Sequence, residues 1–285
     1  MNPPRTIKVA SFLAIAVAAC VLQNHASGQT RGARVVKAGV ATVRVSVRGQ
    51  GNPIVFIASR GRGAEDFDDL CNRLVRAGYQ GILPQPRGIG GSTGPLDAIT
   101  YHDLAADIAA TIRELVGGPA TVVGHAFGGR VARTLAADHP SLVKQLILLA
   151  AAGPVQRSPE ISEASDRAFD EALSREDRLA AIQRAFFAKG NDARVWQEGW
   201  YFSVAKAQRA ADARTPLNEW WAGGSAPILV LQGTEDAIVV PENARRLAAE
   251  FPDRVKLIEI AHAGHAMLPE RPDQIANGIL AYLAR

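Results

Sequence analysis

The stretch TVVGHAFGGR, at residues 121–130, has residue types and spacing that could support nucleophilic chemistry. An apolar run meets a Gly-x-x-x-Gly turn, and a helical pattern follows the turn. In enzymes that form covalent intermediates, the middle of such a turn carries Ser, Cys or Asp, whereas this chain carries Ala126. Because alanine has neither a lone pair nor an acidic proton, an acyl-enzyme at residue 126 is impossible. Any chemistry at this turn must therefore use other groups.

The elements that would position this turn are short apolar strands that alternate with amphipathic helices. Strands are predicted at residues 43–47, 54–57, 81–83, 121–123, 143–149, 228–231 and 255–260. Helices are predicted at residues 65–76, 130–137, 242–250 and 272–283, with a further helix capped by Thr100 and carrying apolar residues as far as Leu115. This alternation predicts a parallel sheet that is covered by helices on both faces.

Residues 154–226 break this rhythm, because they are helical and polar and contain no strand-like apolar run. All four tryptophans of the chain lie in this segment: Trp196, Trp200, Trp220 and Trp221. We expect a helical cap, inserted into a core formed by residues 29–153 and 227–285, over the carboxyl edge of the sheet where open α/β folds bind ligands. Any single tryptophan could instead fill the interior of the cap itself.

Three motifs in this order resemble the α/β-hydrolase superfamily over nearly the whole mature chain. GHAFGG occupies the place of the Gly-x-nucleophile-x-Gly elbow, while QGTED (residues 232–236) and AHAGH (residues 261–265) each follow a predicted strand. The resemblance implies that Asp236 is the catalytic acid and His265 the catalytic base. It also implies the α/β-hydrolase fold, which is an α/β protein with a mostly parallel sheet, helices on both faces and an inserted helical cap.

The sequence departs from the pattern of this family at three parts of the site. Ala58 and Ser59 stand at the usual His-Gly pair, which puts Arg60 at the position whose amide helps to form the oxyanion hole. Gln85 replaces the usual Asp before Arg-Gly-x-Gly, and Ala126 replaces the nucleophile. Because three parts differ together, the pattern favours a naturally divergent branch over a single engineered substitution.

A histidine and a carboxylate can still act as a base without the nucleophile. Asp236 can accept the proton on one ring nitrogen of His265 and leave the other nitrogen free to activate water or deprotonate a substrate. The backbone N–H groups of Phe127 and Arg60 could stabilise an oxyanion. The leading hypothesis is a hydrolase of small ester, lactone or related carbonyl substrates that uses a His–Asp dyad. The alternatives are a catalytically silent small-molecule-binding protein, and a lyase or cofactor-independent oxygenase that uses His265 as a base.

Two serines could replace the missing nucleophile, although both are more commonly turn residues. Ser59 is the stronger candidate because its loop would border the elbow, and Ser92 in GIGGSTG is the weaker one. Arg60, Arg62 and Arg87 are expected to flank the pocket mouth. Together they would favour an acidic or carbonyl-rich substrate in an apolar pocket with a cationic rim.

The other histidines are expected to have supporting roles. We predict that His125 is a packed polar residue that faces away from His265, that His102 lies on the surface, and that His262 orients the loop of His265. No metal site is expected, because AHAGH lacks a third ligand at metal-binding spacing. No cofactor is expected either, because GIGGSTG matches neither a P-loop nor a dinucleotide fingerprint.

The first 28 residues have the pattern of a secretory signal peptide. Arg5 and Lys8 precede an apolar run at residues 9–22, and small residues at 26–28 offer a cleavage site. We therefore expect an exported protein, periplasmic or secreted. A lipobox-like sequence at residues 17–20 is an alternative that would leave a lipid on Cys20, and it is the one route by which we expect membrane attachment.

Composition limits the partners of the mature protein. The chain has 285 residues, of which 47% are hydrophobic and 21% charged, which is ordinary for one large domain or a domain with an insertion. Its arginines are scattered and often opposite acidic residues, so the net charge of +4 does not indicate nucleic-acid binding. Cleavage would leave Cys71 as the single cysteine, without a disulfide. We expect a monomer or homodimer whose partner is a small-molecule substrate.

Overall fold

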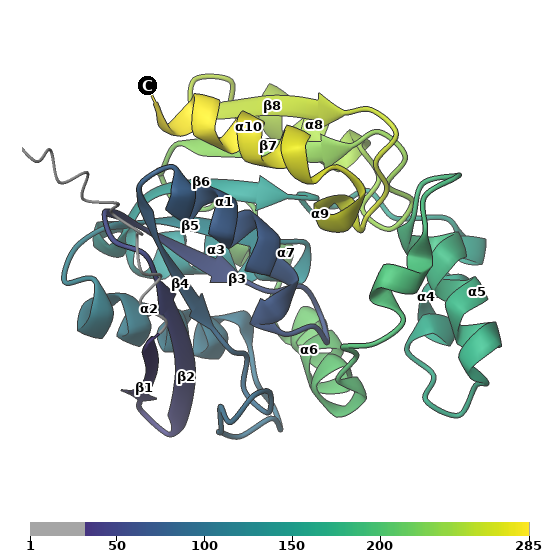
Figure 1. The fold of residues 1–285 in the computed structure, drawn as a ribbon, viewed down its shortest axis with the longest axis horizontal. Helices are drawn as coiled ribbons and strands as arrows, with labels where there is room; N and C mark the ends of the chain where they lie inside the picture. Colours follow the sequence, from purple (N-terminus) through teal and green to yellow (C-terminus); the bar gives the residue numbers. More distant parts are fainter. Residues whose placement is uncertain (1–31, 285) are drawn as a thin grey trace, which may run out of the picture.

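The computed structural model describes residues 32–284, so the predicted signal peptide and Cys20 lie outside the described residues. Its centre is an eight-stranded sheet in the order β1-β2-β4-β3-β5-β6-β7-β8 (Figure 1). The strands are β1 (Gly32–Ala38), β2 (Ala41–Arg48), β3 (Asn52–Ile57), β4 (Tyr79–Pro84), β5 (Ala120–His125), β6 (Val143–Leu149), β7 (Ile228–Gly233) and β8 (Val255–Ile260). The ladder is antiparallel from β1 through β2 to β4, and parallel from β4 to β8. The prediction of a mostly parallel sheet is therefore confirmed.

The strand β1 is the one element of the sheet that sequence patterning missed. It forms an edge and pairs with β2 only, with Gly32 opposite Val47 and Ala38 opposite Ala41. Val35 is 59% exposed there, so the strand lacks the continuous burial of the central parallel strands. By contrast, every residue of β5 and of β7 is buried.

Helices cover both faces of the sheet, as the sequence predicted. The helices α2 (Tyr101–Leu115), α3 (Phe127–Asp138) and α8 (Glu242–Glu250) contribute to the apolar core on one face, and α1 (Asp68–Arg76), α9 (Met267–Glu270) and α10 (Pro272–Leu283) to the core on the other. Thr100 caps α2 in a reciprocal capping box with Asp103, as its sequence position suggested. The predicted helix at 65–76 is divided, because residues Ala64–Phe67 form the 3₁₀ helix η1 before α1.

The segment between β6 and β7 is helical and lies beyond the carboxyl ends of the parallel strands (Figure 1). It contains α4 (Pro159–Ala168), α5 (Arg175–Phe186), the 3₁₀ helix η3 (Ala193–Trp196), α6 (Phe202–Arg214) and α7 (Leu217–Trp220). A separate apolar cluster around Phe186 and Trp196 packs α4, α5 and η3 together. None of the helices described in residues 32–284 is long and apolar enough to span a membrane.

Candidate active site

The elbow, residues 124–128, joins β5 to α3 through a tight left-handed turn. Ala126 has φ 50° and ψ −105°, a conformation that a non-glycine residue adopts only under strain. A Cβ atom on Gly124 would lie 2.5 Å from the carbonyl oxygen of Gly128, and one on Gly128 would lie 2.1 Å from the carbonyl oxygen of Ile57. Only glycine fits at either position, which is the physical reason for the Gly-x-x-x-Gly pattern. Ala126 lines a pocket together with His265.

His265 and Asp236 form a buried pair beside this turn. The Nδ1 atom of His265 lies 3.1 and 3.0 Å from the two carboxylate oxygens of Asp236. The backbone N–H groups of Ile238 and Val239 donate to the same carboxylate over 2.9 and 2.8 Å, which fixes its orientation. His265 Nε2 has no hydrogen-bond partner among residues 32–284, and His265 lines the pocket. This arrangement can hold the imidazole with Nδ1 protonated and Nε2 available as a base.

The loop that carries His265 is held by Glu270, which the sequence reasoning missed. The carboxylate of Glu270 accepts hydrogen bonds from Gly264 N at 2.7 Å, Ala188 N at 2.8 Å and Asn191 Nδ2 at 2.6 Å. Burial raises the pKa of Glu270, and these three donors partly oppose that effect. The carboxylate therefore connects the loop of His265 to the chain that follows α5.

We expect Glu270→Gln to destabilise the protein by about 1–3 kcal/mol, because the new amide places an N–H group opposite a backbone donor. Movement of the His265 loop should also lower turnover more than it changes KM. Urea unfolding and steady-state kinetics would measure both effects. Glu259→Gln is the matched control, because Glu259 is a partly exposed partner of Arg245. Equal effects of the two substitutions would contradict the role assigned to Glu270.

His125 does not face away from His265, so that prediction was wrong. Its Nε2 atom lies 2.9 Å from the carbonyl oxygen of His265, and the two rings are 5.1 Å apart between centroids. The residue is fully buried and also lies near Trp196, at 6.2 Å between centroids. The side chain is packed, as expected, but it supports the backbone of His265. Sequence alone could not show that the loop after β8 returns over the end of β5.

His125 should make folding stability depend on pH. Burial, and secondarily the nearby His265, lowers the pKa of His125 to about 3 from an ordinary value of 6.5. Between these values the unfolded chain binds a proton that the folded chain does not, so stability falls as pH drops from 6.5 towards 3. The His125→Gln variant keeps an N–H donor at the end of its side chain. Between pH 7 and 4.5, we expect its free energy of unfolding to fall by about 2–3 kcal/mol less than that of the native chain. Urea unfolding at both pH values measures this, and equal losses would contradict it.

The remaining two predicted supporting histidines lie at the surface. His262 is exposed, and its Nδ1 atom lies 3.1 Å from Glu235 in the turn that carries Asp236. It connects the two loops from outside, whereas Glu270 connects only the His265 loop to the segment that follows α5. His102 lies between Asp138 and Glu219, at 2.7 and 2.9 Å, and these carboxylates raise its pKa.

Two residues that line the pocket have backbone N–H groups without a hydrogen-bond partner in the described part of the chain. The N–H groups of Phe127 and Arg60 form no hydrogen bond with another described residue, and both residues line the pocket. The loop of Arg60 is fixed by two bonds: Gly61 N donates to Gln208 Oε1 at 2.8 Å, and Ala64 N donates to Gln85 Oε1 at 3.0 Å. Gln85 therefore has a structural role at the position where the family pattern has Asp.

The pocket brings most of the predicted site residues together in a volume of about 670 Å³. Its lining includes Ser59, Arg60, Arg62, Ala126, Phe127 and His265, together with Trp196, Trp200 and Trp220. Trp221 does not line it, and instead packs its ring 5.4 Å from the guanidinium of Arg133. Three of the four tryptophans therefore contribute to the pocket wall.

Two predicted residues lie elsewhere. Arg87 is not at the pocket mouth, because its guanidinium forms a buried two-point ion pair with Asp107 at 2.6 and 2.9 Å. Ser92 is also outside the pocket, where its hydroxyl donates to Gln85 O and accepts from Arg44 N. The glycine-rich loop that contains Ser92 packs against β2, where Thr93 forms a bridge with Thr42.

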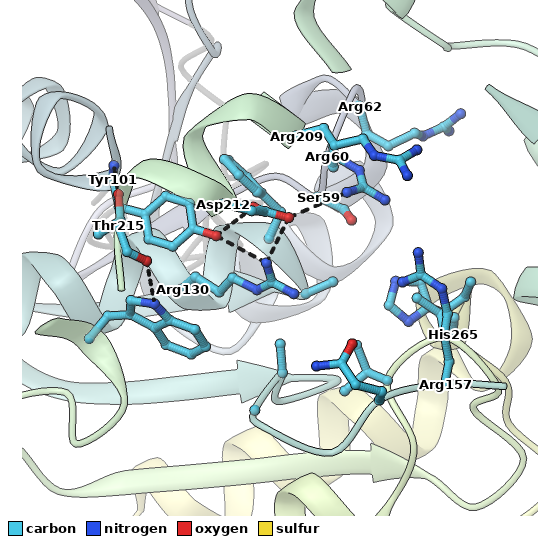
Figure 2. Close-up of a pocket in the computed structure, with 18 of the residues that line it drawn as sticks. Ser59, Arg60, Arg62, Tyr101, Arg130, Arg157, Arg209, Asp212, Thr215 and His265 are labelled. Carbon is cyan, nitrogen blue, oxygen red and sulfur yellow. Dashed lines mark hydrogen bonds and ion pairs between the residues drawn. The ribbon is translucent and has the colours of Figure 1, made fainter. Parts of the chain in front are cut away.

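Sequence reasoning missed a polar group on the far side of the pocket. Figure 2 shows Tyr101, Asp212 and Arg130 across the pocket from His265. Asp212 lies 2.9 Å from Arg130 and 3.6 Å from Arg60, and it accepts a hydrogen bond of 2.5 Å from the Tyr101 hydroxyl. Each of these residues is part of a helical pattern, so no local motif distinguished them from ordinary surface positions.

The fold and the site together place the chain in a known class. The sequence profile of the alpha/beta hydrolase family matches residues 31–277, and the chain belongs to this family. Among curated relatives, the proposed non-heme bromoperoxidase BpoC of Mycobacterium tuberculosis (strain H37Rv) is 28% identical over 251 residues, which cover 83% of this chain and 95% of BpoC. The AB hydrolase superfamily protein YisY of Bacillus subtilis is 28% identical over 264 residues, 84% of this chain and 94% of YisY.

Solved structures share the same fold. An esterase from Exiguobacterium antarcticum superposes with a TM-score of 0.77 at 22% identity, covering 89% of this chain and 100% of the esterase chain.

Within residues 32–284 there is no cluster of three or more His, Cys, Asp or Glu side chains that could hold a metal ion.

Proposed function

We propose that the protein is a hydrolase of small esters, lactones or related carbonyl compounds, in which His265 and Asp236 act without a serine nucleophile. One observation carries the proposal: His265 Nε2 is free at the pocket wall while its Nδ1 is fixed by a buried carboxylate. A side chain with only a methyl group stands at the elbow, at Ala126. Membership of the alpha/beta hydrolase family supports the reaction class.

In the proposed reaction, water occupies the space beside the methyl group of Ala126. His265 Nε2 takes a proton from this water, and the resulting hydroxide adds to the carbonyl carbon of the substrate. The backbone N–H groups of Phe127 and Arg60 donate to the carbonyl oxygen as it becomes negative. The imidazolium then returns its proton to the leaving oxygen when the tetrahedral intermediate collapses, and Asp236 stabilises the imidazolium throughout.

Residues 154–226 contribute much of the pocket lining, including Phe169 and Trp200. We propose that they act as the cap of this enzyme and exclude bulk water from the reacting groups. A dry pocket would strengthen the hydrogen bonds to the oxyanion.

The experiment that tests this function is a panel of small esters, lactones and amides, assayed with the purified mature protein. The proposal expects turnover of at least one ester or lactone, with acid and alcohol as products and without oxygen consumption. Saturable binding without turnover would instead indicate a silent binding protein. Products other than acid and alcohol, or consumption of oxygen, would indicate a lyase or an oxygenase.

We also propose that the protein is exported, on the basis of the amino-terminal pattern. The expected mature amino terminus is Gln29, or a lipid-modified Cys20. Intact mass and amino-terminal sequencing of the protein from its native host would measure this. A protein that still begins near Met1 would contradict export by either route.

A further inference from the structure

The pocket carries an excess of positive charge. Five arginines line it: Arg60, Arg62, Arg130, Arg157 and Arg209. Asp212 is the one acidic residue in the same lining set. Such an arrangement is costly without an anion, because like charges in a partly buried site repel one another and lose hydration.

Three of these arginines have carboxylate partners of their own. Arg62 pairs with Asp66, Arg130 with Asp212, and Arg209 with Asp166. Arg62 also lies over the rings of Trp196 and Trp200, at 4.7 and 5.1 Å, so its guanidinium serves as part of the wall. The surplus therefore comes from Arg60 and Arg157.

The guanidinium of Arg60 lacks a hydrogen-bonded partner among residues 32–284. Its nearest carboxylate, Asp212, is 3.6 Å away and is already bound by Arg130 and Tyr101. The side chain is only 16% exposed and lies over the ring of Phe169 at 5.2 Å. Burial lowers the pKa of Arg60 to about 10, which still leaves it charged at neutral pH.

Arg157 is the second arginine of the pocket without a hydrogen-bonded carboxylate among residues 32–284. Its Nε atom donates to Ser162 Oγ at 3.1 Å, and within the described chain it forms no ion pair with a carboxylate. Arg60 and Arg157 are close enough to influence each other electrostatically. Figure 2 shows their guanidinium groups directed towards the same part of the pocket, near His265.

We propose that the natural substrate is an organic acid, in which one carboxylate binds Arg60 and a second negative oxygen binds Arg157. This proposal rests on the function proposed above and names its substrate class: a carboxylate-bearing ester, lactone or related carbonyl compound. Two separate cations match two carboxylates on a short carbon chain, and the aromatic wall supplies apolar contacts for that chain.

The position of Arg60 connects anion binding to the reaction. Its backbone N–H is a proposed oxyanion donor, and its side chain would bind the carboxylate. The reacting carbonyl and the carboxylate must therefore lie within reach of one residue, only a few bonds apart in the substrate. An anion held in this way would orient the carbonyl towards His265.

The test measures equilibrium binding to the His265→Gln variant, which cannot turn substrate over by the proposed mechanism. The probes are succinate, glutarate and adipate at pH 7, the three corresponding neutral diamides, and inorganic phosphate. Fluorescence of the pocket tryptophans and calorimetry report binding. The tightest dicarboxylate should bind at least about 10-fold more tightly than its diamide, since hydrogen bonds between charged groups are stronger than those between neutral groups.

Arg60→Gln and Arg157→Gln should each raise the Kd of that dicarboxylate about 10-fold or more in the same background. Arg175→Gln is the control, because Arg175 is 65% exposed, pairs with Glu198 and lies outside the pocket. It should leave the Kd unchanged.

Three results would overturn the proposal: equal binding of dicarboxylates and diamides, unchanged Kd values in both pocket variants, or tighter binding of phosphate than of any dicarboxylate. A failure to observe saturable binding of any dicarboxylate would overturn the proposal as well. Because binding is measured on an inert variant, these outcomes do not depend on whether the native protein hydrolyses esters. Failure of the hydrolase proposal would appear separately, in the turnover assays of the native chain.

Discussion

Replacing His265 with glutamine is expected to reduce turnover about 10²–10⁴-fold, which is the usual contribution of a positioned general base. Glutamine keeps polarity and approximate size but cannot accept a proton from water at neutral pH. Since Asp236 is held independently by Ile238 N and Val239 N, the acid side of the pair should remain in place. The measurement is kcat/KM on the best substrate of the panel, with circular dichroism to confirm folding.

His102→Gln is the matched control for this prediction. His102 likewise contacts carboxylates, Asp138 and Glu219, but it is on the surface and outside the pocket. Its replacement should leave kcat/KM within about two-fold, because surface substitutions away from the site have small effects. A His265 variant that retained native activity would contradict the base mechanism.

The second large effect is a gain of chemistry in Ala126→Ser. The strained turn already exists, with φ 50° at residue 126, and the glycines on both sides leave no room for it to relax. One added oxygen would complete a Ser–His–Asp arrangement with His265 and Asp236. We expect new or increased hydrolysis of simple activated esters, and covalent labelling by a serine-directed organophosphonate that does not label the native protein.

The gain should remain well below the activity of an efficient esterase. The loop that supplies the Arg60 N–H has Ala58 and Ser59 in place of the usual His-Gly pair, and displacement of one such donor would cost about 10²–10³ in rate. Ala152→Ser is the control, because it adds a hydroxyl to another small residue of the same pocket wall. It should give neither labelling nor new activity.

A label on the native protein would be equally informative. If it mapped to Ser59, which lines the pocket, the nucleophile would have moved from the elbow and the water mechanism would be wrong. Ser92 cannot have this role in the structure, because its hydroxyl is bonded to Gln85 O and lies outside the pocket.

The fold could be predicted from sequence because its signals are local and strong. Strands such as β5 and β7 are buried along their whole length, and Gly124 and Gly128 stand where two backbone segments approach too closely for any other residue. The edge strand β1 was missed because its sequence, GARVVKA, has no long apolar run. Its position at the edge leaves Val35 exposed, unlike the buried residues of the central strands.

The site was predicted only where a motif marks the position. Ala126, Asp236 and His265 follow strands of the parallel sheet, so the topology brings them to one edge. Asp212 lies on α6, and Arg157 lies in the loop between β6 and α4. Nothing in the sequence of this segment indicates which side chains face the pocket. Arg87 was misplaced because no local motif shows that it pairs with Asp107 on α2 instead of facing the pocket.

Intact-mass analysis of the native protein, quenched during steady turnover of its best ester substrate, tests the central claim most directly. Hydrolysis by water activated at His265 leaves the protein at its unmodified mass at every time point, while acid and alcohol accumulate without an initial burst. A population heavier by the mass of the acyl group, located on Ser59 or any other side chain, would show a covalent intermediate. That result would contradict catalysis by the His265–Asp236 pair alone.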